Sequence, residues 1–384
     1  MDLNLILEKT RHISKEILEE DASIIEKEER WPERGIRALQ AAGLGGLVVP
    51  IDYGGLGQGL VGMVRVCEIL GNHCASTALC LGMHFSATAT ISVKATPYHI
   101  ENFLKPICEG THLTTLALSE TGTGAHFYFP ETELFDETEN HFRINGQKSF
   151  ITNGNFADSF VFSTTAVNST NLEGLFSLLL ATNGSQGLSW GKEWKGLGMK
   201  GNNSRTLNIE NLQIEKKNLL GNKGDHVWYA FHIIAPFFLT AMTGTYLGIA
   251  NRAYEEARSH ILKRTHNHSR KSLSEDPMVQ YKLSQIWVKI ERTRQYVYWA
   301  CKEFDEGGPD ALHAILSTKA EVGDCVIEVV NEALTLCGGS AYNEHSVLKR
   351  LLLDARACHV MAPTTDMLRL WAGRSLLDQP LLGD

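Results

Sequence analysis

The sequence predicts an α+β multidomain fold, with an α-helical domain at residues 1–115, a β-sandwich or barrel domain at 116–228 and a four-helix bundle at 229–384. Three observations predict this order. Apolar residues recur at helical spacing near the start, short runs of β-forming residues fill the middle, and long helical patterns return at the end. No internal repeat or low-complexity linker interrupts this succession.

The first domain is predicted from its helical periodicity. Apolar residues follow a helical period from Leu3 to Ile25, and Trp31-Pro32 interrupts the pattern. Further helical patterns, separated by glycine-rich turns, cover residues 33–42, 60–72 and 76–95. Because no strand-like run occurs between them, we expect this domain to be all-helical.

The middle domain is predicted from short β-forming runs. Residues 142–144 and 160–162 are aromatic or β-branched at most positions, and residues 175–181 and 207–214 continue the pattern. Asn145-Gly146 lies between two such runs and predicts a two-residue β-hairpin turn. We therefore expect a sandwich or an open barrel here.

The last domain is predicted from long apolar helical faces. From Val279 to Phe304 apolar residues keep to one face, and four long helices fit into the domain. The stretch from Val227 to Asn251 is uncharged, but it contains His232 and Pro236. This composition favours a buried helix over a membrane span.

Composition limits the possible partners. The chain has 384 residues, 43% of them hydrophobic, and a net charge of −8, which argues against nucleic acid or an anionic membrane surface as the main partner. The eight cysteines form no Cys-x-x-Cys pair, and the first residues lack a basic, apolar leader. We expect a cytoplasmic protein with reduced thiols and a small-molecule or protein-linked substrate.

Motifs read without family knowledge leave the function open. The chain has neither a Gly-x-Gly-x-x-Gly fingerprint after a strand nor a phosphate-binding loop. His260, His266 and His268 lie in a basic stretch without nearby acids or cysteines, which is typical of a solvated loop. We expect no metal site and an organic cofactor.

Five segments, taken together and in order, carry a resemblance to a known family. They are residues 49–57, 117–124, 145–154, 194–201 with 218–221, and 336–342 followed by Arg350 and Asp354. The most specific is Asn145-Gly146-Gln147-Lys148-Ser149-Phe150-Ile151-Thr152-Asn153-Gly154. In this order the segments resemble the acyl-CoA dehydrogenase family over nearly the whole chain.

The resemblance implies an FAD cofactor and a set of residues around it. Leu118 and Ser119 match positions at the flavin pyrimidine, Phe150 the aromatic residue against the isoalloxazine, and Thr152 the residue that reaches flavin N5. The cofactor diphosphate of a neighbouring subunit is expected near Gly338 and Gly339, and further cofactor contacts at Thr364 and Asp366. A homotetramer or homodimer is implied, with an electron-transfer flavoprotein or oxygen as electron acceptor.

The sequence departs from the family at the catalytic base. The glutamate that removes the α-proton occupies one of two positions in most members, and these hold Ala362 and Phe238 here. Neither side chain accepts a proton. Losing a positioned base typically costs roughly 10²- to 10⁴-fold in rate, so the usual α,β-desaturation needs another acceptor.

Three functional hypotheses remain open. In the first, the protein oxidises an acyl thioester held on coenzyme A or an acyl carrier protein, with His84 as a substitute base or as a satisfied core histidine. A variant of this hypothesis is oxidation of a hydroxyacyl or aminoacyl unit on a carrier protein, where the acidic proton is on oxygen or nitrogen.

The second hypothesis is a two-component flavin monooxygenase, in which His359 acts near a dry flavin pocket. The third is a flavin-binding scaffold without turnover. Reduction of the flavin by an acyl thioester without oxygen would separate the first hypothesis from the other two.

Overall fold

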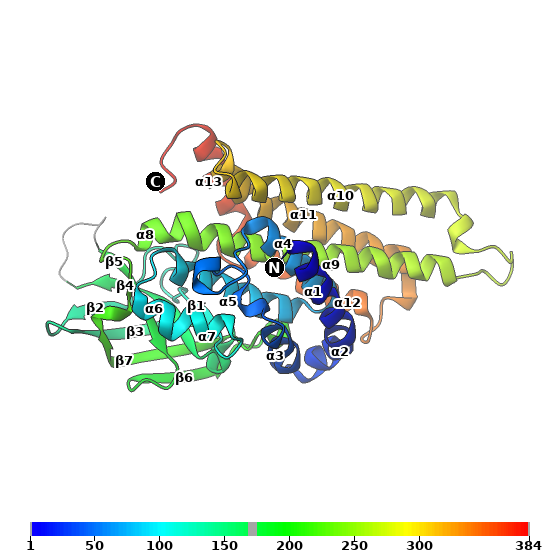
Figure 1. Ribbon diagram of the computed structural model, residues 1–384. Coiled ribbons are helices and arrows are strands. Elements are labelled where there is room, and N and C mark those ends of the chain that lie inside the picture. The colour runs from blue at the N-terminus through cyan, green and yellow to red at the C-terminus, as the bar shows by residue number, and fades with distance from the viewer. Residues whose placement is uncertain (1, 168–174, 383–384) are drawn as a thin grey trace.

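The computed structural model describes residues 2–167 and 175–382. An eight-stranded sheet lies at one end of the molecule, and long helices extend from it to the other end (Figure 1). The N-terminal helices, blue in the figure, pack along these long helices. The predicted order of a helical part, a sheet and a helical part is confirmed.

Helices make up the N-terminal part, as predicted. Residues Ser14–Leu18 form a wide turn that joins the first two helices. The fifth helix consists almost wholly of small and apolar residues and is buried on every side, which is typical of a helix at the centre of a core. The helices are α1 Leu3–Ile13, α2 Glu19–Glu28, α3 Glu33–Ala41, α4 Leu60–His73, α5 Ala75–Val93, α6 Pro97–His99 and α7 Lys105–Cys108.

The sheet has the strand order β6-β7-β3-β2-β4-β5-β8, with β1 paired to β4. The pairs β1–β4 and β2–β4 are parallel, and the other pairs are antiparallel. Its aromatic and branched residues pack into a cluster of their own beside the helical core. The strands are β1 Thr114–Ala117, β2 Glu133–Asp136, β3 His141–Ile151, β4 Ser159–Ala166, β5 Phe176–Thr182, β6 Leu188–Glu193, β7 Arg205–Glu215 and β8 Leu219–Leu220.

The predicted hairpin at Asn145-Gly146 is wrong, because β3 continues through both residues. The ladder with β7 is irregular there, and the Asn145 side chain accepts a hydrogen bond from the backbone N–H of Asn211 at 2.6 Å. A Cβ atom on Gly146 would lie 2.6 Å from Thr132 Oγ1. The glycine therefore admits a neighbouring segment instead of a turn.

The C-terminal part contains three long helices and a broken fourth, which corrects the expectation of four long helices. The chain leaves the helix at Met361 and re-enters one at Thr365. Pro363 lies in this break, where its missing N–H could not continue a helix. The helices are α8 His226–Tyr229, α9 Ala235–Lys263, α10 Pro277–Asp305, α11 Ala311–Cys337, α12 Val347–Val360 and α13 Thr365–Leu376.

The apolar stretch around α9 is buried, as expected. The helical run His226–Lys263 is long and apolar enough to cross a membrane by composition, but 83% of its most apolar window is buried inside the protein. This helix packs against α4, α5 and α11. It therefore forms the centre of the helical core.

Candidate active site

A cavity of about 800 Å³ lies between the sheet and the helices. The β side of its wall comes from the loop after β1 and the end of β3. The helical side comes from α5, the start of α9, α12 and the segment between α12 and α13. Such a cavity between domains is the usual place for a cofactor and a substrate.

The β side brings together residues that are distant in sequence. Leu118 and Ser119 follow β1, Thr152 follows β3, and all three line the cavity. The Ser149 N–H donates to the Ser119 carbonyl at 2.8 Å, and the Thr115 hydroxyl donates to the Thr152 carbonyl at 2.9 Å. The predicted pyrimidine-side and N5-side residues therefore share one wall.

Phe150 stands at the cavity mouth because the backbone bulges there. Its φ is 55°, and its register with β7 shifts between Lys148 and Ile151. The ring is 55% exposed and meets Trp194 edge to face, at a centroid distance of 5.8 Å. Ile151 is 1% exposed and belongs to the sheet core. Phe150, one residue earlier, is thus not part of that core.

The helical side lacks an acid at both expected positions. Phe238 on α9 and Ala362 in the break between α12 and α13 both line the cavity, and neither can ionise. Thr364 also lines it, and its side chain accepts from the Met367 N–H at the start of α13. The substitutions therefore change the surface that faces the cavity and not a distant part of the fold.

His84 does not line the cavity, which corrects its assignment as a substitute base. Its ring is fully buried, with Nε2 3.0 Å from the Gly45 carbonyl and Nδ1 accepting from the Thr114 N–H at 3.1 Å. Burial lowers the pKa of His84 to about 4. Both nitrogens are engaged by the backbone, so the ring acts as a satisfied core histidine.

His359 and Asp366 also lie outside the cavity lining. His359 Nδ1 is 2.9 Å from the Thr365 hydroxyl, and burial lowers its pKa. The Asp366 side chain is fully exposed and lies 4.0 Å from Arg369. These positions do not support His359 as the monooxygenase residue or Asp366 as a contact in this cavity.

The predicted diphosphate glycines are remote from the cavity. Gly338 and Gly339 begin the turn after α11, and a Cβ atom on either would meet nothing within 4 Å. They are not part of the cavity lining. Their predicted contact is with a neighbouring subunit, so this position leaves the prediction open.

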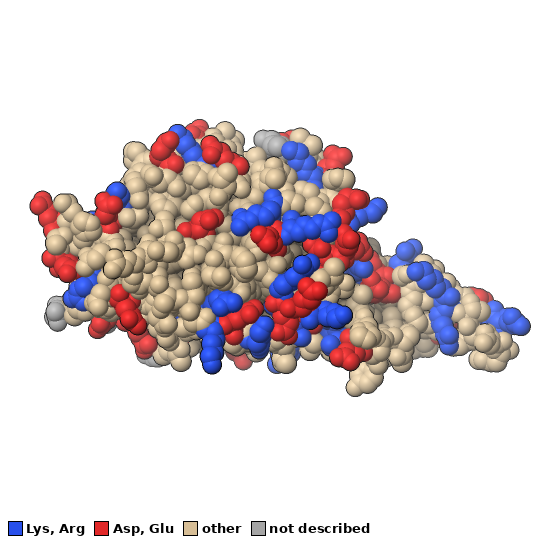
Figure 2. Space-filling model, turned by 90° about the horizontal axis from the view of Figure 1, so that it is seen from below, with Lys and Arg blue, Asp and Glu red and all other residues tan. Residues whose placement is uncertain are grey.

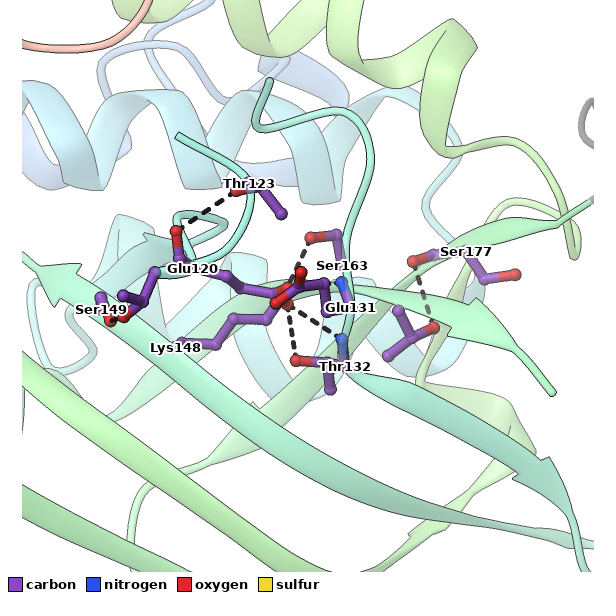
Figure 3. Close-up of polar contacts among 10 residues, drawn as sticks. Glu120, Thr123, Glu131, Thr132, Lys148, Ser149, Ser163 and Ser177 are labelled. Atoms are coloured by element: carbon purple, nitrogen blue, oxygen red, sulfur yellow. Dashed lines mark hydrogen bonds and ion pairs between the residues drawn. The ribbon is translucent and has the colours of Figure 1, made fainter. Parts of the chain in front are cut away.

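Sequence reasoning missed a buried ion pair on the β side. Glu120 lines the cavity, and its carboxylate accepts from Lys148 Nζ at 2.5 Å, with side chains 2% and 0% exposed (Figure 3). Both residues lie inside motifs that carried the family resemblance. Strand β3 mixes polar and apolar residues, so no signal in the sequence indicated that Lys148 is buried; once it is buried, its charge needs a partner.

It also missed Lys319 on α11, which is fully buried behind the helical wall. Its ammonium donates to the carbonyls of Met361 and Pro363, both at 2.7 Å. Burial lowers the pKa of Lys319 to about 8. These carbonyls flank Ala362, so Lys319 supports the backbone at the position of the missing base.

The chain has three parts, with a cavity between its sheet and its helices that is lined by an aromatic residue and by hydroxyl groups. Family models for the acyl-CoA dehydrogenase N-terminal, middle and C-terminal domains match residues 2–111, 115–212 and 240–377. The chain belongs to the acyl-CoA dehydrogenase family.

Relatives of known identity agree with this assignment. The chain is 26% identical over 377 residues to a short-chain-specific acyl-CoA dehydrogenase of Clostridium acetobutylicum, covering 96% of this chain and 98% of the relative. Butyryl-CoA dehydrogenase from Megasphaera elsdenii has the same fold, with a TM-score of 0.92, 23% identity and coverage of 98% and 100%. The prolyl acyl carrier protein oxidase AnaB matches at a TM-score of 0.87, with 20% identity and coverage of 97% and 98%.

The residues of the cavity fit the family's cofactor, FAD. The Phe150 ring projects from the bulge at the cavity mouth, where it can cover an aromatic ring system. Hydroxyl groups of Ser119, Thr121 and Thr152 lie on the same wall, where they can donate to ring heteroatoms. When bound, FAD accepts a hydride from the substrate, and these residues would hold its isoalloxazine.

Proposed function

We propose that the protein is an FAD-dependent oxidoreductase that oxidises an acyl thioester at a carbon bonded to nitrogen or oxygen. The thioester is carried by coenzyme A or by a carrier protein. In this reaction a hydride would pass from the α-carbon to bound FAD, a proton would pass from the attached N–H or O–H to solvent water, and a C=N or C=O bond would form. No carbon acid has to be deprotonated.

The observation that carries this proposal is the chemistry of the cavity lining. Glu120 is the one carboxylate among the described residues that line it. Its oxygens accept from Lys148, from Thr132 N–H and Oγ1, and from the Glu131 N–H. Burial opposes its ionisation, but the contact with Lys148 holds the pKa of Glu120 below its usual value. A carboxylate bound in this way is a poor base for a carbon acid.

A carrier-linked substrate is supported by the shared fold with a prolyl acyl carrier protein oxidase. The surface charge fits a partner other than nucleic acid, since cations and anions are interspersed over much of the face seen in Figure 2. Exposed aromatic residues on α10, Tyr281, Trp287 and Trp299, favour the expected homodimer or homotetramer. An electron-transfer flavoprotein or oxygen would reoxidise the flavin.

Anaerobic reduction of the flavin by matched thioesters tests the proposal. Aminoacyl and 2-hydroxyacyl units are offered on pantetheine, on coenzyme A and on a carrier protein, beside the saturated acyl unit of equal length. We expect the absorbance of the oxidised flavin band, at about 450 nm, to fall when the substrate reduces the flavin. The rate of this fall should be at least about tenfold higher with the aminoacyl or hydroxyacyl substrates than with the saturated ones.

Faster reduction by the saturated acyl thioester would contradict the proposal. Turnover that requires an external reductase and oxygen would replace it by the monooxygenase hypothesis. A flavin that none of these conditions reduces or turns over would replace it by the scaffold hypothesis.

A further inference from the structure

Glu120 is part of the β wall of the cavity, and its partner Lys148 lies behind that wall. Lys148 Nζ is 2.5 Å from Glu120 Oε1 and donates to the Ser163 hydroxyl at 3.0 Å. The same carboxylate oxygen accepts from the Thr132 hydroxyl at 2.6 Å and from its N–H at 3.1 Å. The other oxygen accepts from the Glu131 N–H. One carboxylate thus collects donors from several segments (Figure 3).

These segments are distant in sequence and carry different parts of the wall. Glu120 belongs to the loop after β1, Thr132 precedes β2, Lys148 lies in β3 and Ser163 in β4. Gly146 allows this convergence, because a side chain there would collide with Thr132. The pair is therefore the point at which the loop after β1 is joined to the strands beneath it.

Each member of the pair is adjacent in sequence to cavity residues. Glu120 follows Leu118 and Ser119, and Lys148 precedes the bulge that turns Phe150 toward the cavity. Besides the hydrogen bond between Ser149 N–H and the Ser119 carbonyl, the hydroxyls of Thr121 and Ser149 lie 3.3 Å apart. A shift of either charged side chain would move both halves of the wall.

Stability alone is a weak reason for such a pair. Removing two charges from water costs as much as or more than their attraction returns, and apolar residues of similar volume often replace a buried pair without loss. Burial lowers the pKa of Lys148 to about 8, which records this cost. Burial, and secondly the charge of nearby Lys148, lower the pKa of His226 to about 3. The histidine is thus neutral and does not compete for the carboxylate.

We propose that Glu120 and Lys148 are positioning residues for the flavin. By joining the loop after β1 to the start of the β3 bulge, they hold Leu118 and Ser119 on one side and Phe150 and Thr152 on the other at the separation that the isoalloxazine requires. The inference concerns cofactor binding, so it stands independently of the substrate proposed above.

A comparison of single and double variants tests the inference. The variants are Glu120→Gln, Lys148→Met and the two combined, studied as flavin-loaded protein. Flavin release on dilution is followed by fluorescence, thermal unfolding by circular dichroism, and the flavin environment by its absorption spectrum. Each single variant leaves an unpaired buried group and should unfold at a lower temperature.

The double variant separates positioning from stability. We expect it to recover most of the unfolding temperature lost in the single variants, while flavin affinity stays at least tenfold weaker than in the unaltered protein and the spectrum shifts. If the double variant binds flavin as tightly as the unaltered protein, with the same spectrum, the inference is overturned.

A matched control pair lies away from the cavity. Glu68 on α4 and Arg294 on α10 form an ion pair at 2.8 Å, with side chains 13% and 15% exposed. The combined variant Glu68→Gln, Arg294→Met should change the unfolding temperature but not the flavin affinity. An equal loss of flavin from this control would overturn the inference, because general destabilisation would then explain both results.

A milder variant covers the case in which the double variant does not fold. Thr132→Val removes the hydroxyl that donates to Glu120 and keeps both charges and nearly the same volume. We expect a roughly two- to fivefold weaker flavin affinity, about the value of a single hydrogen bond, and a smaller loss of unfolding temperature than in either charge variant, because both charges stay paired. Unchanged affinity and an unchanged spectrum in this variant would count against positioning.

Discussion

The two walls of the cavity use buried lysines in different ways. On the β wall, Lys148 has a carboxylate partner in Glu120. On the helical wall, Lys319 has no carboxylate within 4.0 Å in the described part of the chain, and its ammonium is held by the Met361 and Pro363 carbonyls. Both lysines are fully buried.

This difference separates the support of the cofactor from the chemistry of the substrate. The β wall keeps a complete polar network behind the residues expected to contact the flavin. The helical wall keeps a lysine that shapes the backbone around Ala362, but no acid faces the cavity there. Among the described residues that line the cavity, the helical wall thus has no acid, and the one carboxylate of the β wall is held by Lys148.

Adding an acid to the helical wall should give the largest effect. Phe238→Glu places a carboxylate in a mostly apolar cavity, where burial should raise its pKa toward neutrality. We expect anaerobic flavin reduction by a saturated acyl thioester to accelerate by roughly 10²- to 10⁴-fold, the usual contribution of a positioned base. Stopped-flow absorbance measures this rate.

Phe238→Gln is the matched control, since it has nearly the same shape and polarity without a basic oxygen. If both variants bind flavin and reduce it at the same rate, the two walls differ in more than the missing acid.

Removing His84 tests whether the contact of α5 with Gly45 and with the start of β1 is structural. His84→Ala leaves the buried Gly45 carbonyl and Thr114 N–H without their partner. Unsatisfied buried groups cost about 1–3 kcal/mol each, so the loss of two partners should lower the free energy of unfolding by about 2–6 kcal/mol. Chemical denaturation measures this loss. The dependence of flavin reduction on pH should stay the same between about pH 6 and 8, where an ordinary histidine titrates.

A His84→Ala protein of unchanged stability that no longer reduces its flavin would reverse this conclusion. The histidine would then be a base after all, and the proton chemistry would lie on α5 instead of at positions 238 and 362.

Asp354 gives the smallest of these effects and concerns the helical wall. Burial raises the pKa of this carboxyl on α12 to about 6, although the Met199 N–H donates to it at 2.5 Å. The folded protein therefore binds a proton more tightly than the unfolded chain between about pH 4 and 6. The stability contributed by this group is full at the acidic end and is lost as the pH rises through about 6.

Asp354→Asn should remove this dependence. Chemical denaturation at about pH 4.5 is compared with that at about pH 7. Between these two pH values, the unfolding free energy of the unaltered protein relative to the variant should fall by up to about 1.4 kcal/mol for each unit by which the pKa of Asp354 is raised. A constant difference across this range would show that Asp354 is ionised throughout.

Local sequence patterns predicted most elements because their residues face one environment along their whole length. The periods around α4, α5 and α10 and the runs of β4 and β5 follow from burial of one or both faces. The Asn145-Gly146 hairpin failed for the opposite reason. A glycine can permit a turn or the close approach of another segment, and only the position of Thr132 distinguishes the two.

The candidate site was predicted in part. Motifs placed Leu118, Ser119, Phe150, Thr152 and Thr364 at the cavity that they line. His84, His359 and Asp366 do not line this cavity, because matching a motif along the chain does not reveal which neighbours surround each side chain. The partners of His84 are Gly45 and Thr114, which are 39 and 30 residues away.

By itself, the sequence determined the family, the order of helical and β regions, and the absence of an acid at positions 238 and 362, since these depend on residue identity and local periodicity. Only the tertiary structure decided that both positions face one cavity, that Glu120 meets Lys148 across 28 residues, and that His84 is already satisfied. Hydrogen bonds and ion pairs act over a few ångströms in space, so contacts between distant segments exist only once the chain has folded.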